Sequence, residues 1–203
     1  MATYRGFDVL ELDPDRGTGL GEDFERKVFV LDNVTGRRAA DAPDLSSASV
    51  KEFAWLTYTR AEAKVLREFI DARAGRAVPC WVPAWEEDMT LTADVAPGGL
   101  ALTVLEMGYA VRVFPVGNVR RHLAIRIPGG AFYFRKVTGA ADNGNGTETV
   151  TIEEGVPVTI PTNALIGFLH FARLDDDVAE IEWAGQFAEC RFRLRDLPAE
   201  TPA

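Results

Sequence analysis

The stretch AEIEWAGQFAECRFRLR, residues 179–195, decides the fold class because its side chains alternate with a period of two. Apolar residues stand at every second position: Ala179, Ile181 and Trp183, then Ala188, Cys190, Phe192 and Leu194. Glu and Arg fill most of the positions between them. This alternation predicts strands of a sheet that has one buried face and one solvated face.

A strand followed by a helix is predicted earlier in the chain. Residues 53–58 carry apolar side chains on both faces, which favours a strand covered on both sides. Thr59 and Glu62 form the pattern of a capping box, in which each side chain bonds the backbone N–H of the other residue. Apolar residues then recur at helical spacing, and Gly75 stands where a left-handed C-terminal cap would fall.

Short β-branched and aromatic runs predict most of the remaining strands. These runs are 27–31, 100–106, 109–114, 123–127, 131–137, 149–152, 156–160 and 168–174. Pro79 and Pro83 favour an extended edge or a loop over a central strand for residues 75–85. Residues 138–146 are rich in Gly, Asp and Asn, and we expect a mobile loop tip there.

The order of elements is strands, one helix, then many strands, which indicates an α+β protein that is mostly β. We expect a β-sandwich or split barrel with one packed α-helix and an inserted small β-barrel. The expected core domain comprises residues 1–90 plus 163–203, and the expected inserted all-β domain comprises residues 91–162.

The charge balance excludes several classes of partner. The chain has 22 basic and 31 acidic residues, a net charge of -9, so sequence-specific nucleic-acid binding is not expected. No apolar run approaches the roughly 18 residues that span a bilayer, and we expect no membrane partner. The first residues lack the apolar core of a signal peptide, which favours folding in the cytosol.

Few residues point to chemistry, and we expect no catalytic residue, no metal and no cofactor. Cys80 and Cys190 are interpreted as buried thiols. Neither His122 nor His170 has a second His or Cys at ligand spacing. The glycine-rich run 17–21 lacks the Lys and Ser/Thr of a phosphate-binding loop. A hydrolase built on a Cys–His pair or on paired carboxylates stays open, because sequence does not place these groups in space.

Trp81 and Trp85, with Pro83 between them, suggest two alternatives. They pack in the core or at a sheet edge, or they form an exposed aromatic platform for a sugar or a partner protein. The second alternative makes the chain a carbohydrate- or ligand-binding β module, which requires exposed tryptophan rings.

Two separated parts of the chain resemble bacteriophage tail proteins. Residues 53–62 and 66–83 resemble a segment in which a strand leads into a helix that ends in Gly-Arg, followed by Pro and Trp. Residues 168–198 resemble the last hairpin of such proteins. The resemblance is to minor and distal tail proteins of long-tailed phages, and it covers about a third of the chain.

The resemblance implies a structural protein of the virion without catalytic residues. Such a protein forms a ring of subunits, often six, that joins the tail tube to the tip or baseplate hub. The implied partners are further copies of the chain and other tail proteins, and the implied location is the virion tail, assembled in the host cytoplasm. The candidate interface or binding residues are Arg76, Trp81, Pro83, Trp85, Asp142, Asn143 and Asn145.

Overall fold

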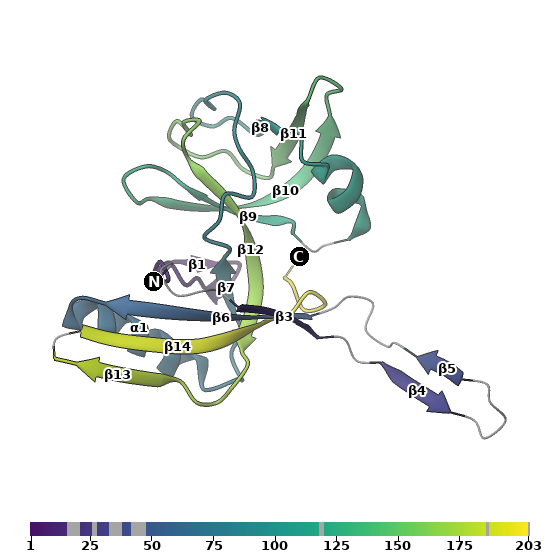
Figure 1. Cartoon of the computed structure of the whole chain (residues 1–203). Helices are drawn as coiled ribbons and strands as arrows, with labels where there is room; N and C mark the ends of the chain where they lie inside the picture. The colour runs from purple at the N-terminus through teal and green to yellow at the C-terminus, as the bar shows by residue number, and fades with distance from the viewer. Residues whose placement is uncertain are drawn as a thin grey trace. The chain divides into compact units, whose positions relative to one another are not determined.

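The computed structural model describes residues 1–15, 21–25, 28–32, 38–41, 48–117, 120–185 and 187–202 (Figure 1). Strands make up 47% of the structure and helices 13%, so the expected class, α+β and mostly β, is confirmed. The glycine-rich run 17–21 and Lys27, the first residue of the predicted strand 27–31, lie outside the described residues, apart from Gly21.

The chain divides into two compact units. Unit 1 comprises Met1–Leu12, Cys80–Phe171 and Thr201–Ala203, and unit 2 comprises Asp13–Pro79 and Ala172–Glu200. Each unit is defined by the dense contacts among its own residues. The expected core domain of 1–90 plus 163–203, with an insert at 91–162, stays a prediction.

The sheet of unit 2 is built around two long antiparallel strands, β6 (Ala48–Thr57) and β14 (Phe187–Asp196). β3 (Gly21–Glu25) pairs with β6, and β13 (Glu180–Ala184) pairs with β14, both antiparallel. Four apolar residues of β14 that alternate in sequence are buried: Ala188, Cys190, Phe192 and Leu194. Arg residues occupy the positions between the last three, as the alternation of 179–195 predicts.

One α-helix, α1 (Arg60–Arg73), covers the apolar face of this sheet. The capping box is confirmed: Thr59 Oγ1 accepts from the Glu62 N–H at 3.2 Å, and Glu62 Oε2 accepts from the Thr59 N–H at 3.2 Å. Helix residues Ala63, Leu66 and Phe69 are buried. The Phe69 ring lies 6.5 Å from that of Phe192 on β14, so the helix and the sheet share one core.

The face of β6 away from α1 is more exposed than the sequence predicts. On the α1 side, Trp55 is buried and stacks on Phe192 at a centroid distance of 4.2 Å. Leu56 and Tyr58, however, are 38% and 61% exposed. The strand is therefore not covered on both sides along its whole length, and that prediction is wrong at these positions. The reason is the register, which sets Leu56 opposite the charged Glu189 on the face that α1 does not cover.

Two short hairpins are separate two-stranded sheets. β1 (Thr3–Tyr4) pairs with β2 (Phe7–Asp8) in unit 1. β4 (Phe29–Asp32) pairs with β5 (Arg38–Asp41) in unit 2. The predicted strand at 27–31 is thus confirmed as a strand with shifted bounds.

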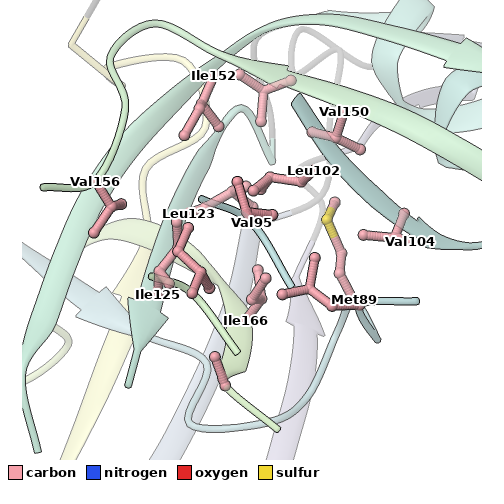
Figure 2. Close-up of a cluster of buried hydrophobic side chains, with 14 of the residues drawn as sticks. Met89, Val95, Leu102, Val104, Leu123, Ile125, Val150, Ile152, Val156 and Ile166 are labelled. Atoms are coloured by element: carbon pink, nitrogen blue, oxygen red, sulfur yellow. The ribbon is translucent and has the colours of Figure 1, made fainter. Parts of the chain in front are cut away.

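Unit 1 contains an antiparallel sheet in the order β12, β9, β10, β11, β8. The bounds are β8 Ala101–Leu105, β9 His122–Arg126, β10 Phe132–Asp142, β11 Thr147–Ile152 and β12 Leu165–Leu174. β12 contributes residues 165–171 to unit 1 and 172–174 to unit 2. Aliphatic side chains from these strands and from the segments between them form a core, part of which is drawn in Figure 2.

Residues 80–83 form an extended strand, β7 (Cys80–Pro83), bounded by the two prolines. β7 pairs with β12, and Trp81 bridges to Val9 on its other side. Pro79 and Pro83 thus stand at or next to the strand ends, where a missing N–H costs least.

Two predicted strands of unit 1 are wrong. Residues 109–114 form a π-helix, η1 (Tyr109–Val113), and the start of a 3-10 helix, η2 (Phe114–Val116). The buried carboxylate of Glu148 accepts from the N–H groups of Tyr109 and Ala110 at 3.0 and 3.2 Å, which holds the helical turn in place. Of residues 156–160, only Ile160 pairs, in an isolated bridge with Val95, since Pro157 supplies no N–H.

Candidate interaction surfaces

The two candidate tryptophans are buried. Trp81 is 0% exposed and Trp85 is 4% exposed, and Pro83 is buried between them. The Trp81 ring lies 4.7 Å from the imidazole of His122 and 5.0 Å from the ring of Phe171, and its Nε1–H donates to the Tyr4 carbonyl at 2.9 Å. The exposed aromatic platform is therefore wrong for these residues, and the core-packing alternative holds.

Arg76 is held by a carboxylate of the loop that follows β12. Its Nε and Nη2 donate to the two carboxylate oxygens of Asp177 at 3.1 Å each, and its backbone N–H donates to Oδ1 at 3.1 Å. These hydrogen bonds lower the pKa of Asp177 and raise that of Arg76. Arg76 remains exposed, but its guanidinium is engaged in linking the end of α1 to the 175–177 turn.

The expected loop at 138–146 is shorter than predicted, because residues 138–142 continue strand β10 and only 143–146 form the turn. β10 continues to Asp142, and Gly139 pairs with Thr151 next to an irregularity at residue 138. The turn is tied by its own side chains: Asp142 Oδ1 accepts from the Gly144 N–H at 2.8 Å, and Asn145 Oδ1 accepts from the Thr147 hydroxyl at 2.7 Å. Asp142, Asn143 and Asn145 are exposed at a hydrogen-bonded hairpin tip.

A polar cluster in unit 1 was not found from the sequence. The Tyr4 hydroxyl lies 3.0 Å from Nδ1 of His122 and accepts from Arg5 Nε at 3.2 Å. Arg5 Nη2 also forms an ion pair with Glu153, which in turn accepts from the Lys136 N–H at 3.2 Å. The partners lie 118 and 148 residues apart, so no local spacing could have indicated them.

The cluster keeps its buried members neutral. Burial, then the positive charges of Arg5 and Lys136, lower the pKa of His122 to about 4. Burial also raises the pKa of Tyr4 to about 12. The imidazole is 2% exposed, and its ring donates to the carbonyl of Pro202. At neutral pH these contacts therefore hold together the β1–β2 hairpin, β9 and residue 202.

The cysteines are both buried, as expected, at 0% for Cys80 and 1% for Cys190. Burial raises the pKa of the Cys190 thiol to about 11, which disfavours the nucleophilic thiolate. In the part of the chain that the structure describes, no three His, Cys, Asp or Glu side chains gather as a metal site. None of the described helices is long and apolar enough to cross a membrane.

Exposed aromatic side chains gather at the β13 end of unit 2. Trp183 on β13 is 55% exposed, and a groove of about 390 Å³ separates it from α1 residues Arg60, Lys64 and Arg67. On the other face, Tyr58 and Phe187 are 61% and 41% exposed and meet edge to face at 5.9 Å. Large exposed aromatics are the residues that contribute most to protein interfaces.

The face of the unit 2 sheet away from α1 carries a ladder of ion pairs. Arg193 Nε bonds Glu52 at 3.0 Å, Arg191 Nη2 bonds Glu189 at 2.5 Å, and Arg195 bonds both Glu25 and Asp175. The pKa of each of these three arginines is raised, by hydrogen bonds to its carboxylate partner above all. These pairs are solvent-exposed, so each stabilises the fold only slightly.

Unit 1 has a second set of exposed apolar side chains around η1 and η2. The set comprises Leu105, Met107, Val111 and Val116, which are 52%, 43%, 64% and 81% exposed. Phe114 beside them is covered by Arg121, whose guanidinium lies 3.6 Å from the ring centroid. This apolar set is the unit 1 counterpart of the exposed aromatics on unit 2.

Comparison with protein-family models gives no match, and comparison with curated protein sequences gives none either.

Proposed function

We propose that this chain is a structural subunit of a phage tail, a distal tail or baseplate-hub ring protein that links the tail tube to the tail tip. The proposal assigns it no catalysis, metal or cofactor. Its partners are further copies of itself, which close into a ring such as a hexamer, and the neighbouring tube and hub or tip proteins. Its location is the virion tail, after assembly in the host cytoplasm.

The observation that carries the proposal is the pair of exposed edge strands of unit 2. β3 and β13 each pair with one neighbour in the described part of the chain, and exposed aromatic side chains stand on both. Free strand edges are templates for pairing with another chain. Two unlike edges on one subunit favour head-to-tail contacts, which close into rings when the rotation allows.

Two further features support an assembly role. The exposed apolar set at Leu105, Met107, Val111 and Val116 provides unit 1 with a surface of its own for a neighbouring tail protein. The candidate residues Asp142, Asn143 and Asn145 lie on a hydrogen-bonded hairpin tip, which presents polar groups at low entropic cost on binding. The net charge of -9 would let DNA pass through a ring without sticking.

Trp81 and Trp85 do not provide the exposed rings that the carbohydrate-binding alternative requires, because both are buried. The ring proposal is tested by light scattering coupled to size-exclusion chromatography, with negative-stain images of the same fractions. A closed ring of identical subunits is expected. A chain that stays monomeric at several hundred micromolar would contradict self-assembly, and with it this function.

A further inference from the structure

The unit 2 sheet ends in two edges that fit each other. Among the described strands, β3 pairs with β6 alone and β13 pairs with β14 alone. Every residue of β3 is exposed, and so are four of the five residues of β13. The two strands lie at opposite edges, with β6 and β14 between them, so they cannot pair within one copy.

Strand direction makes the two edges compatible. Neighbours in the series β3, β6, β14 and β13 are all antiparallel, so β3 and β13 run in opposite directions. A second copy added beside β13 in the same orientation brings its β3 antiparallel to that strand. We propose that Gly21–Glu25 of one copy adds to the free edge of Glu180–Ala184 of the next and continues the sheet from subunit to subunit. This inference rests on the proposed ring function and names its interface.

The register assigns complementary side chains to the same face. Glu22 pairs with Lys51, Cys190 pairs with both Trp55 and Ile181, and Ala188 pairs with Trp183. Because side chains alternate along β6, the residues on the α1 side are Glu22, Phe24, Trp55, Ile181 and Trp183. In the register that pairs all five residues of the two strands, Glu22 lies opposite the exposed Trp183, and Phe24, which is 73% exposed, is the diagonal neighbour of Trp183 on the same face.

Charge favours the same pairing. The groove between α1 and Trp183 is rimmed by Arg60, Lys64 and Arg67, a cationic cluster on an acidic chain. Within the described residues, Arg60 and Arg67 have no ion-pair partner, and Lys64 is 3.5 Å from Glu68. Glu22 of an added strand would approach this rim, since it shares the α1 side; in its own chain its partner is Lys51, at 3.6 Å. An acidic strand that carries one Phe thus matches a groove of one Trp and three cationic side chains.

On the face away from α1, like charges oppose the contact. Substitutions on that face are therefore expected to change association in the opposite direction from substitutions on the aromatic face. In the register that pairs all five residues, Asp23 and Glu25 stand across from Glu182 and Glu180. Like charges directly opposite each other destabilise a pair of strands. Removing one of these charges is therefore expected to strengthen association, whereas adding an acid to the aromatic face is expected to weaken it.

Sedimentation equilibrium of single variants of the full chain tests both signs. Phe24→Glu and Trp183→Glu alter exposed side chains and are expected to weaken association at least tenfold, while Glu182→Gln strengthens it several-fold. Leu100→Glu, at a 47% exposed position of unit 1, is the matched control and leaves association between identical copies unchanged. A ring that forms equally well in both aromatic variants overturns this interface and leaves the proposed function standing. A chain that is monomeric even as Glu182→Gln overturns both.

A disulfide between copies tests the register. Full pairing sets Asp23 opposite Glu182, whose partner in its own chain is Glu189 and not a thiol. A mixture of Asp23→Cys and Glu182→Cys chains is therefore expected to form covalent dimers under mild oxidation, and the double variant longer ladders. The native thiols are buried, so each single variant alone serves as the control. Only monomers on a non-reducing gel of the mixture would overturn the proposed pairing.

Discussion

The Tyr4 hydroxyl lies 3.0 Å from Nδ1 of His122, 118 residues further along the chain. Arg5 Nε donates to the same hydroxyl at 3.2 Å, and the hydroxyl donates to Glu153 Oε1 at 3.4 Å. The imidazole donates in turn to the carbonyl of Pro202. The pair therefore connects three distant segments of unit 1 through one buried ring.

Acid is expected to destabilise unit 1 through His122. Its pKa is about 4 in the folded chain and 6.5 when unperturbed, so the unfolded chain binds more protons between these values. The contribution is full above pH 6.5 and is lost as the pH falls from 6.5 through 4, a change of about 3 kcal/mol. Urea unfolding at pH 7, 5.5 and 4.5 measures it. His122→Gln should show a shallower dependence, and equal slopes for the two chains would contradict this role.

Removal of the Tyr4 hydroxyl is expected to lower stability. Tyr4→Phe leaves Nδ1 of the buried His122 without its hydroxyl partner and deprives Arg5 Nε of this acceptor, at a cost of about 1–3 kcal/mol. The control is Tyr58→Phe, at a side chain that is 61% exposed. Urea midpoints at pH 7 compare the two variants. An equal effect of both would show that the Tyr4 hydroxyl does not stabilise the fold through His122 and Arg5.

Gly75 is expected to tolerate no side chain. Its φ is +65°, and an added Cβ would lie 2.6 Å from Asp177 Oδ1. Asp177 can move away only by losing its hydrogen bonds to Arg76, so Gly75→Ala should cost about 2 kcal/mol or more. Gly144→Ala has a similar φ of +69° and open space, and should cost about 1 kcal/mol. Thermal unfolding checks this, and in an Asp177→Ala background the excess should vanish.

The buried carboxylate of Glu148 is expected to be needed for the η1 helix. Both of its oxygens accept backbone N–H groups, from Tyr109 and Ala110. Glu148→Gln keeps the shape but turns one acceptor into a donor that faces an N–H, at a cost of about 1–3 kcal/mol. Glu106→Gln, at an exposed position, is the control. Hydrogen exchange of the 109–113 amides should rise in Glu148→Gln alone, and unchanged protection would contradict the cap.

Local patterns predicted the elements that are stabilised locally. The period of two in residues 179–195 identified β13 and β14, and the pair of Thr59 and Glu62 placed the start of α1. Two of the failures depend on distant partners. Residues 109–114 look like a strand until Glu148 caps their N–H groups from 39 residues away. Leu56 looks buried until the register sets it beside Glu189.

The same limit applies to the candidate interface residues, because their exposure depends on distant neighbours in the fold. Trp81 and Trp85 were selected for their residue type, yet packing buries both, because Trp81 lies between the His122 and Phe171 rings. Alternation predicts Trp183 on the buried face, yet it is exposed, because alternation does not reveal where a sheet ends. An edge strand is defined by the neighbour that it lacks, and only the strand order shows that β3 and β13 are the edges.

The mass of the native chain in solution tests the central claim most directly. Sedimentation velocity over a hundredfold range of concentration, at neutral pH and moderate salt, should reveal one discrete species whose mass is a fixed multiple of 22.3 kDa. Such a species is expected if head-to-tail contacts close into a ring. A single 22.3 kDa species at every concentration would contradict the account.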